Sequence, residues 1–152
     1  KWQLHENYVT ALAVRGGTLL SCGFDRRLIW SAFDAGKAIR SVEAHAGWVR
    51  KLVLTPDGAL AVTVGDDMLA KVWDAETGKP VVSLSGHEAK TPEGYLSALY
   101  ALAVSPDGTY AATGDRLASP AHCDRWEASP SASRTRLITA KIAMVLKPYA
   151  SR

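Results

Sequence analysis

Histidine, hydroxyl and carboxylate side chains recur together in this chain, and their types match those of a nucleophilic catalytic triad. His45 is followed by Thr63 and Asp67, and the same three kinds of side chain recur after His5. A histidine held between a carboxylate and a hydroxyl can act as a general base that activates the hydroxyl. That chemistry needs one exposed nucleophile beside an oxyanion-binding site, whereas this trio recurs along the chain. The recurrence favours a structural role, so no catalytic residue is predicted.

The trio belongs to a repeat with a period of about 40 residues. His5, His45 and His87 lie 40 and 42 positions apart, and an apolar run of strand length follows each of them. These runs are residues 9–14, 49–54 and 99–104. Turn sequences such as Pro56-Asp57-Gly58 come next, in which Pro fixes φ while Asp-Gly supplies a side-chain hydrogen bond and a positive φ. Strands joined by tight hairpins at this period are typical of the four-stranded antiparallel blades of a β-propeller.

Residues 4–116 resemble the WD40 repeat family, and the second repeat carries the resemblance most completely. Its matching motifs are Ala44-His45, Pro56-Asp57-Gly58, Gly65-Asp66-Asp67, Val72-Trp73-Asp74 and Gly78-Lys79, and Ser85-Gly86-His87 opens the next repeat. The resemblance implies an all-β fold of WD40-type propeller blades. We place blade 1 at residues 1–44, blade 2 at 45–86 and a partial blade 3 at 87–116.

These blades are too few to close a ring. A propeller typically has about 4–8 blades, and closure covers the sheets that would otherwise lack a neighbour. Two blades and half of a third would leave sheet faces bare. We therefore expect an incomplete propeller, completed by the missing blades of a larger protein or by self-association.

The resemblance also implies a role for the recurring polar side chains. In WD40 repeats a His, a Ser or Thr, an Asp and a Trp form a hydrogen-bonded chain inside the blade, as buried polar groups require. The matching residues are His45, Thr63, Asp67 and Trp73 in the second repeat and His5, Ser21, Asp25 and Trp30 in the first. The first network is less regular, because Asp25 lies five residues before Trp30 whereas Asp67 lies six before Trp73. The third repeat has His87, Thr113 and Asp115, but no matching Trp.

The third repeat also carries an insertion at residues 88–97. Insertions in propellers fall in loops on one face, which is often the binding face. Lys90, Pro92 and Tyr95 are therefore candidate binding residues. The alternative interpretation is a longer connecting loop without a binding role.

No metal site and no cofactor is predicted. The turn carboxylates Asp57, Asp66 and Asp67 fall short of the six or more oxygen ligands that calcium takes. Residues 122–124 (His-Cys-Asp) lack the second ligand pair that zinc requires. The two cysteines are far apart in the sequence, and we expect two free thiols, with Cys22 buried in a strand.

Residues 117–152 form a basic tail outside the repeat. They carry 6 basic and 2 acidic side chains, whereas residues 1–116 carry 12 and 13. The Ser, Ala and Pro content of residues 118–133 favours an irregular or disordered chain, and residues 135–147 fit a short helix or, alternatively, a strand. The tail is either a natural basic appendage or the product of a shifted reading frame or truncated gene model. The abrupt loss of the repeat favours the second interpretation.

We expect a non-catalytic WD40 scaffold that binds other proteins and is a fragment of a larger propeller. The alternative is a regulatory propeller domain of a larger enzyme whose catalytic part lies elsewhere. Nucleic-acid binding is disfavoured because the basic tail lacks interleaved aromatic side chains. No membrane association is expected, since no run approaches the roughly 20 apolar residues of a membrane-spanning helix. The compartment is unknown, with the cytoplasm as the default, because the chain starts at Lys1 rather than Met and the absence of a targeting signal therefore tells little.

Overall fold

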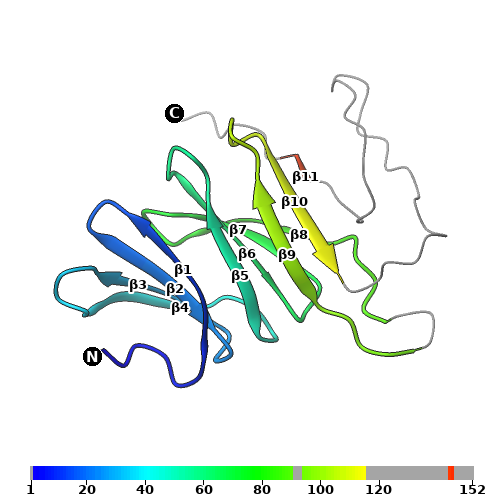
Figure 1. Cartoon of the computed structure of the whole chain (residues 1–152), viewed down its shortest axis with the longest axis horizontal. Coiled ribbons are helices and arrows are strands. Elements are labelled where there is room, and N and C mark those ends of the chain that lie inside the picture. Colours follow the sequence, from blue (N-terminus) through cyan, green and yellow to red (C-terminus); the bar gives the residue numbers. More distant parts are fainter. Residues whose placement is uncertain (1, 91–93, 116–143, 146–152) are drawn as a thin grey trace.

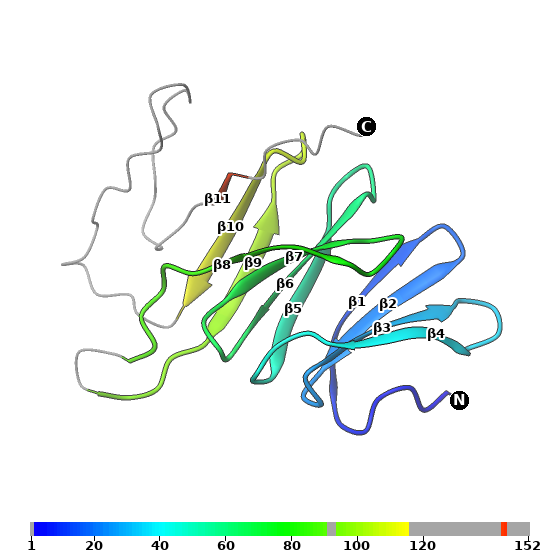
Figure 2. The same ribbon diagram turned by 180° about the vertical axis from the view of Figure 1, so that it is seen from behind.

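The computed structural model describes residues 2–90, 94–115 and 144–145, whose strands form three antiparallel sheets arranged as a fan (Figures 1 and 2). The first sheet holds β1 (Val9–Arg15), β2 (Thr18–Gly23), β3 (Arg27–Ala32) and β4 (Ala38–Glu43) in that order. The second holds β5 (Val49–Leu54), β6 (Leu60–Gly65), β7 (Ala70–Asp74) and β8 (Pro80–Leu84). The third holds β9 (Leu99–Val104), β10 (Tyr110–Asp115) and β11 (Met144–Val145), in the spatial order β11-β10-β9. The predicted all-β fold of four-stranded blades is confirmed, and the described sheets do not close into a ring.

The hairpin between β5 and β6 follows from the side chain of Asp57. Its Oδ1 accepts hydrogen bonds from the Thr55 hydroxyl and from the N–H of Ala59. Gly58 adopts the positive φ of 69° that the tight turn needs. Asp107 holds the β9–β10 hairpin in the same way, so the repeated Pro-Asp-Gly sequence repeats a turn.

Strands β2 and β6 each end at a glycine, because the neighbouring backbone comes too close to leave room for a side chain. A Cβ at Gly65 would lie 2.8 Å from the carbonyl oxygen of Trp48, and one at Gly23 would meet the carbonyl of Tyr8. A register shift occurs at both places, between Val49 and Lys51 in the second sheet and at the matching residues of the first. The Gly that precedes the turn Asp in the first two repeats is thus fixed by this close approach.

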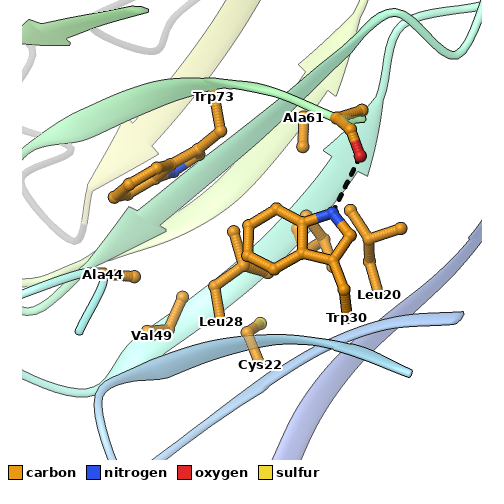
Figure 3. Packing of buried hydrophobic residues seen from close by; sticks show 10 residues of the cluster. Leu20, Cys22, Leu28, Trp30, Ala44, Val49, Ala61 and Trp73 are labelled. Carbon is orange, nitrogen blue, oxygen red and sulfur yellow. Dashed lines mark hydrogen bonds between the residues drawn. The ribbon is translucent and has the colours of Figure 1, made fainter. Parts of the chain in front are cut away.

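The main core lies between the first and second sheets (Figure 3). Strand alternation directs Leu52 and Ala61 of the second sheet toward the first, where they meet Leu20 and Leu28. The opposite face of the second sheet packs on the third through Val62, Val72 and Ala111. The second sheet, which lies between two others, therefore packs against a neighbour with each of its faces.

Side chains of the first sheet also donate hydrogen bonds to backbone carbonyls of the second. Thr10 Oγ1 donates to the carbonyl of Val49 over 2.6 Å, and Arg15 Nε donates to that of Gly58 over 2.7 Å. Arg40 Nη1 donates to the carbonyl of Glu76 over 2.9 Å. Because these acceptors are main-chain groups, the contact between sheets depends on strand positions more than on the side chains of the second sheet.

The third sheet receives a strand from the basic tail. Tyr110 pairs with Val145 and Ala111 with Met144. The corresponding residues of the second sheet, Leu60 and Ala61 of β6, pair with Asp74 and Trp73 of β7. Residues 144–145 thus stand in the place of the third blade strand, in agreement with the alternative of a strand within residues 135–147. At these two residues the chain is extended rather than helical, and the other parts of the tail lie outside the described residues. In the described ranges no helix is long and apolar enough to cross a membrane.

Candidate functional site

A continuous chain of hydrogen bonds runs through the second sheet, from Asp67 to Trp73. The His45 Nδ1–H donates to Asp67 Oδ1 over 2.8 Å. Thr63 Oγ1 lies 2.8 Å from His45 Nε2, and the Trp73 indole N–H donates to Thr63 Oγ1 over 2.9 Å. The segment before β5 positions the histidine, β6 the threonine, the β6–β7 turn the aspartate and β7 the tryptophan.

The direction of this chain follows from which groups can donate. A carboxylate only accepts, so His45 carries its proton on Nδ1 toward Asp67. Nε2 of the neutral imidazole then accepts from the Thr63 hydroxyl, whose oxygen remains free to accept from Trp73. Every side-chain polar group in this network from Asp67 to Trp73 has a hydrogen-bond partner, as a buried network requires.

Asp67 also fixes the turn that carries it. The N–H groups of Ala46 and Leu69 donate to its carboxylate. Burial alone would raise the pKa of Asp67, but the hydrogen bonds from His45 and from these N–H donors outweigh that effect. The pKa of Asp67 therefore lies below its ordinary value, and the residue is a carboxylate at neutral pH.

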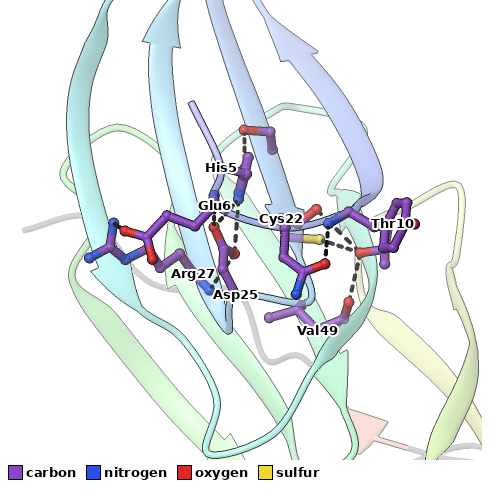
Figure 4. A network of polar contacts seen from close by, with 10 residues as sticks. His5, Glu6, Thr10, Cys22, Asp25, Arg27 and Val49 are labelled. Atoms are coloured by element: carbon purple, nitrogen blue, oxygen red, sulfur yellow. Dashed lines mark hydrogen bonds and ion pairs between the residues drawn. The ribbon is translucent and has the colours of Figure 1, made fainter. Parts of the chain in front are cut away.

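The first sheet contains the same hydrogen-bonded network of Asp, His and hydroxyl, but without the Trp (Figure 4). The His5 Nδ1–H lies 2.8 and 2.9 Å from the two carboxylate oxygens of Asp25, and Nε2 lies 2.8 Å from Ser21 Oγ. Burial would raise the pKa of Asp25, but hydrogen bonds from His5 and the N–H groups of Arg27 and Glu6 lower it on balance. An exposed ion pair between Arg27 and Glu6 borders the site.

Trp30 does not join this network, and the prediction that it does is wrong. Its indole N–H donates over 2.8 Å to the backbone carbonyl of Ala75 in the second sheet. The reason is strand alternation: Trp30 pairs with Leu20, whereas Ser21 pairs with Ile29. The spacing of five residues instead of six from the turn Asp turns Trp30 to the opposite face of the sheet.

Ser31 occupies the position that Trp73 has in the second sheet. Ser31 pairs with Leu19, two residues before Ser21, just as Trp73 pairs with Ala61, two residues before Thr63. Its hydroxyl donates to the Leu19 carbonyl. The first blade thus places a small residue on its network face and turns its tryptophan toward the neighbouring blade.

The third sheet has the same trio. The His87 Nδ1–H donates to Asp115 Oδ2 over 2.7 Å, and Nε2 lies 2.8 Å from Thr113 Oγ1. His87 reaches its partners although the insertion at residues 88–97 separates it from β9.

The three trios lie inside the blades, away from solvent. The Thr63 side chain is fully buried, and His45, Ser21 and Thr113 are also buried. A substrate carbonyl has no access to these hydroxyls in the conformation described, so the geometry suits support rather than nucleophilic attack. Among the described residues, no three His, Cys, Asp or Glu side chains gather closely enough to hold a metal ion.

Cys22 is a free, buried thiol in β2, as predicted for that residue. Burial raises its pKa to about 11, against the smaller effect of a hydrogen bond with Thr10. A thiol with so high a pKa is a poor nucleophile. Cys123 and the neighbouring His and Asp lie outside the described residues.

The predicted binding loop is described in part. Lys90 forms an isolated bridge with Leu96, and Tyr95 is exposed at the loop surface. Pro92 lies outside the described residues. The loop leads into β9 at the end of the fan where β1 and β5 also begin (Figure 1).

Sequence reasoning missed Arg50 and the aromatic residues around it at this same end. The guanidinium of Arg50 pairs with Asp66 and lies against rings from all three sheets. One signal was present in the sequence: Tyr8 and Trp48 both lie three residues after the repeat histidine. The position of Tyr100 beside them depends on how the blades pack, which the repeat spacing does not state.

Repeated antiparallel sheets that each enclose a His–hydroxyl–Asp chain define the class of protein as one built from β-propeller blades. The family model "WD domain, G-beta repeat" matches residues 36–74 and 78–119, more than half of the chain. The chain therefore belongs to the WD40 repeat family.

Individual relatives agree with this family. The chain is 33% identical over 117 residues to Nuclear distribution protein PAC1 of Arthroderma otae, covering 66% of this chain and 25% of that protein. It is 35% identical over 79 residues to Protein TOPLESS-RELATED PROTEIN 2 of Oryza sativa subsp. japonica, covering 48% of this chain and 7% of that protein. The chain thus spans about a quarter, or less, of the length of these relatives.

A solved structure shows the same fold. The crystal structure of the WD40 beta propeller domain of Doa1 matches with a TM-score of 0.62 at 23% sequence identity. The match covers 73% of this chain and 34% of that chain. The fan of sheets is therefore the arrangement of neighbouring blades in a WD40 propeller.

Proposed function

We propose that this chain is part of a non-catalytic WD40 scaffold that binds other proteins. The main support is that the recurring His, hydroxyl and Asp side chains, whose types match a catalytic triad, are hydrogen-bonded within the blades, and Thr63 and His45 are buried there. The loops and strand ends are among the surfaces that the chain presents to other molecules. WD40 domains typically act as interaction scaffolds, which agrees with this arrangement.

The test is selection from a random peptide library displayed on phage, with the whole chain as the target. We expect related peptide sequences to be enriched on the folded chain and not on the same chain unfolded in urea. Failure to enrich any peptide on the folded chain would contradict the scaffold function.

The outer face of the first sheet supports membership in a larger propeller. Leu12 and Val14 are more than half exposed there, although both pair with strand β2 on the face that carries the buried His5 network. Apolar strand residues exposed side by side are typical of a sheet face that has lost its neighbour. A further blade, from the same larger protein or from a second copy, would cover them.

Light scattering after size-exclusion chromatography, together with circular dichroism, tests this second part. A β-rich oligomer would show that copies of the chain cover the open faces. An aggregated or poorly folded chain would show that blades of the larger protein are required. A stable, well-folded monomer would contradict the need for further blades.

A further inference from the structure

The end of the fan at which β1, β5 and β9 begin carries an aromatic cluster centred on Arg50. The guanidinium carbon of Arg50 lies 5.3 Å from the ring centroid of Phe24, 5.0 Å from that of Trp48 and 5.1 Å from that of Tyr100. Each ring comes from a different sheet: Phe24 from the β2–β3 turn, Trp48 from the segment before β5, and Tyr100 from β9. One cation thus joins the three blades at the surface.

The aromatic rings of the cluster contact one another, and Tyr8, Trp48 and Tyr100 are exposed to solvent. Phe24 stacks on Trp48 at 4.2 Å with an interplanar angle of 14°, and Tyr8 meets Phe24 edge-on at 6.0 Å. The exposed fraction is 44% for both Trp48 and Tyr100 and 76% for Tyr8. Contiguous exposed aromatic surface of this kind marks a binding site more often than scattered exposed residues do.

The charges in the cluster limit what can bind. Arg50 is held by Asp66 through two hydrogen bonds, from Nε over 2.5 Å and from Nη2 over 2.9 Å. The paired charges of Arg50 and Asp66 cancel, so the cluster carries no net charge that would attract either a cation or a carboxylate. The cluster is therefore complementary to an uncharged ligand.

We propose that this cluster (Tyr8, Phe24, Trp48, Arg50 and Tyr100) docks an uncharged, proline-rich segment in the extended polyproline conformation. This inference rests on the proposed scaffold function and names the partner for one surface. Pyrrolidine rings pack flat on aromatic faces, and the polyproline backbone offers unpaired carbonyls to side-chain donors. The Trp48 indole N–H is such a donor, since none of the described residues accepts a hydrogen bond from it. The partner segment is preformed, so it loses little conformational entropy when it binds.

The test measures fluorescence anisotropy of a labelled oligoproline peptide with the whole chain, beside labelled oligolysine and oligoglutamate of equal length. We expect oligoproline to bind more tightly than either charged peptide. Tyr100→Ala and Tyr8→Ala should each weaken its binding by about tenfold, as loss of an aromatic anchor does. Phe33→Ala is the matched control: Phe33 is also half exposed but lies at the opposite end of the first sheet, and its loss should leave binding unchanged. Circular dichroism verifies that each variant stays folded.

The inference is overturned if oligoproline does not bind, if a charged peptide binds more tightly, or if Phe33→Ala weakens binding as much as Tyr100→Ala. The phage selection separates this failure from failure of the scaffold function. Enriched peptides that lack proline would leave the scaffold function standing and refute the proline-rich partner. A selection that enriches no peptide would refute both.

Discussion

The indole N–H of Trp30 donates a hydrogen bond of 2.8 Å to the backbone carbonyl of Ala75, and so joins the first blade to the second through a buried contact (Figure 3). Trp30 also packs in the core cluster with Leu28 and Trp73. A residue assigned from sequence to a network within its own blade thus holds two blades together.

Replacement of this tryptophan tests its role between the blades. Trp30→Phe keeps an aromatic ring but leaves the Ala75 carbonyl without its donor, so we expect a loss of about 1–3 kcal/mol in the free energy of unfolding. Urea denaturation followed by circular dichroism measures this loss. Trp2→Phe, at a half-exposed indole, serves as the control and should stay within about 0.5 kcal/mol of the wild type. Equal effects of the two substitutions would contradict the assigned contact.

Leu12 and Leu52 occupy the same position in consecutive blades, yet their exposed fractions are 61% and 5%. We expect Leu52→Ala to cost about 2–5 kcal/mol of stability, because it opens a cavity between two blades. Leu12→Ala should cost less than about 1 kcal/mol in the isolated chain, since little buried contact is lost. Urea midpoints of the two variants give the comparison. A large effect at Leu12 would mean that its face is covered, for instance by a second copy.

Thr63 lies in the middle of the network of the second blade, where its hydroxyl donates a hydrogen bond to His45 and accepts one from Trp73. Thr63→Val keeps the shape but leaves His45 Nε2 and the Trp73 indole N–H unpaired, so we expect a loss of about 1–3 kcal/mol for each buried unsatisfied group. Thermal unfolding measures the change. Ser83→Val, on the exposed strand β8, is the control and should have little effect. A neutral Thr63→Val would show that the chain of hydrogen bonds contributes little to stability.

The lowered pKa of Asp67 makes stability depend on pH. Between its folded and unfolded pKa values the folded protein binds fewer protons, so stability rises with pH in that range. The contribution is complete above the ordinary aspartate pKa of about 4 and is lost as the pH falls through the lower, folded value. Urea unfolding at a series of pH values from neutral to acid should show a shallower loss in Asp67→Asn than in the wild type. Identical slopes would refute the contribution of this residue.

Burial of Cys22 predicts slow alkylation. With its pKa raised to about 11, the thiol is almost fully protonated at pH 8 as well as inaccessible. In a Cys123→Ser chain, we expect iodoacetamide to react with Cys22 only when the first blade opens, far more slowly than with a free peptide thiol. Mass spectrometry of the modified chain over time gives the rate, and urea should restore fast labelling. Rapid reaction in native buffer would show that β2 is not buried.

Local chemistry made much of the fold predictable. The Asp57 turn depends on residues within a few positions of one another, and the pairing of His45 with Thr63 and Asp67 has a counterpart, in the same order along the sequence, in each repeat. The orientation of Trp30 was mispredicted because family motifs were matched by residue type, although one missing residue reverses the face of a strand. For residues 135–147 the sequence left both a helix and a strand open, since a two-residue pairing with β10 leaves no periodic pattern that decides between them.

The sequence by itself determined the blades: their period, their hairpins, and the His–hydroxyl–Asp trio within each, because all of these rest on short spacings within one repeat. The tertiary structure decided what happens between blades. It brought Arg50 against rings from three sheets, turned Trp30 to Ala75, and left Leu12 exposed while covering Leu52. These relationships depend on which face of each sheet meets a neighbour, and that is set by packing across the whole fan rather than by any local pattern.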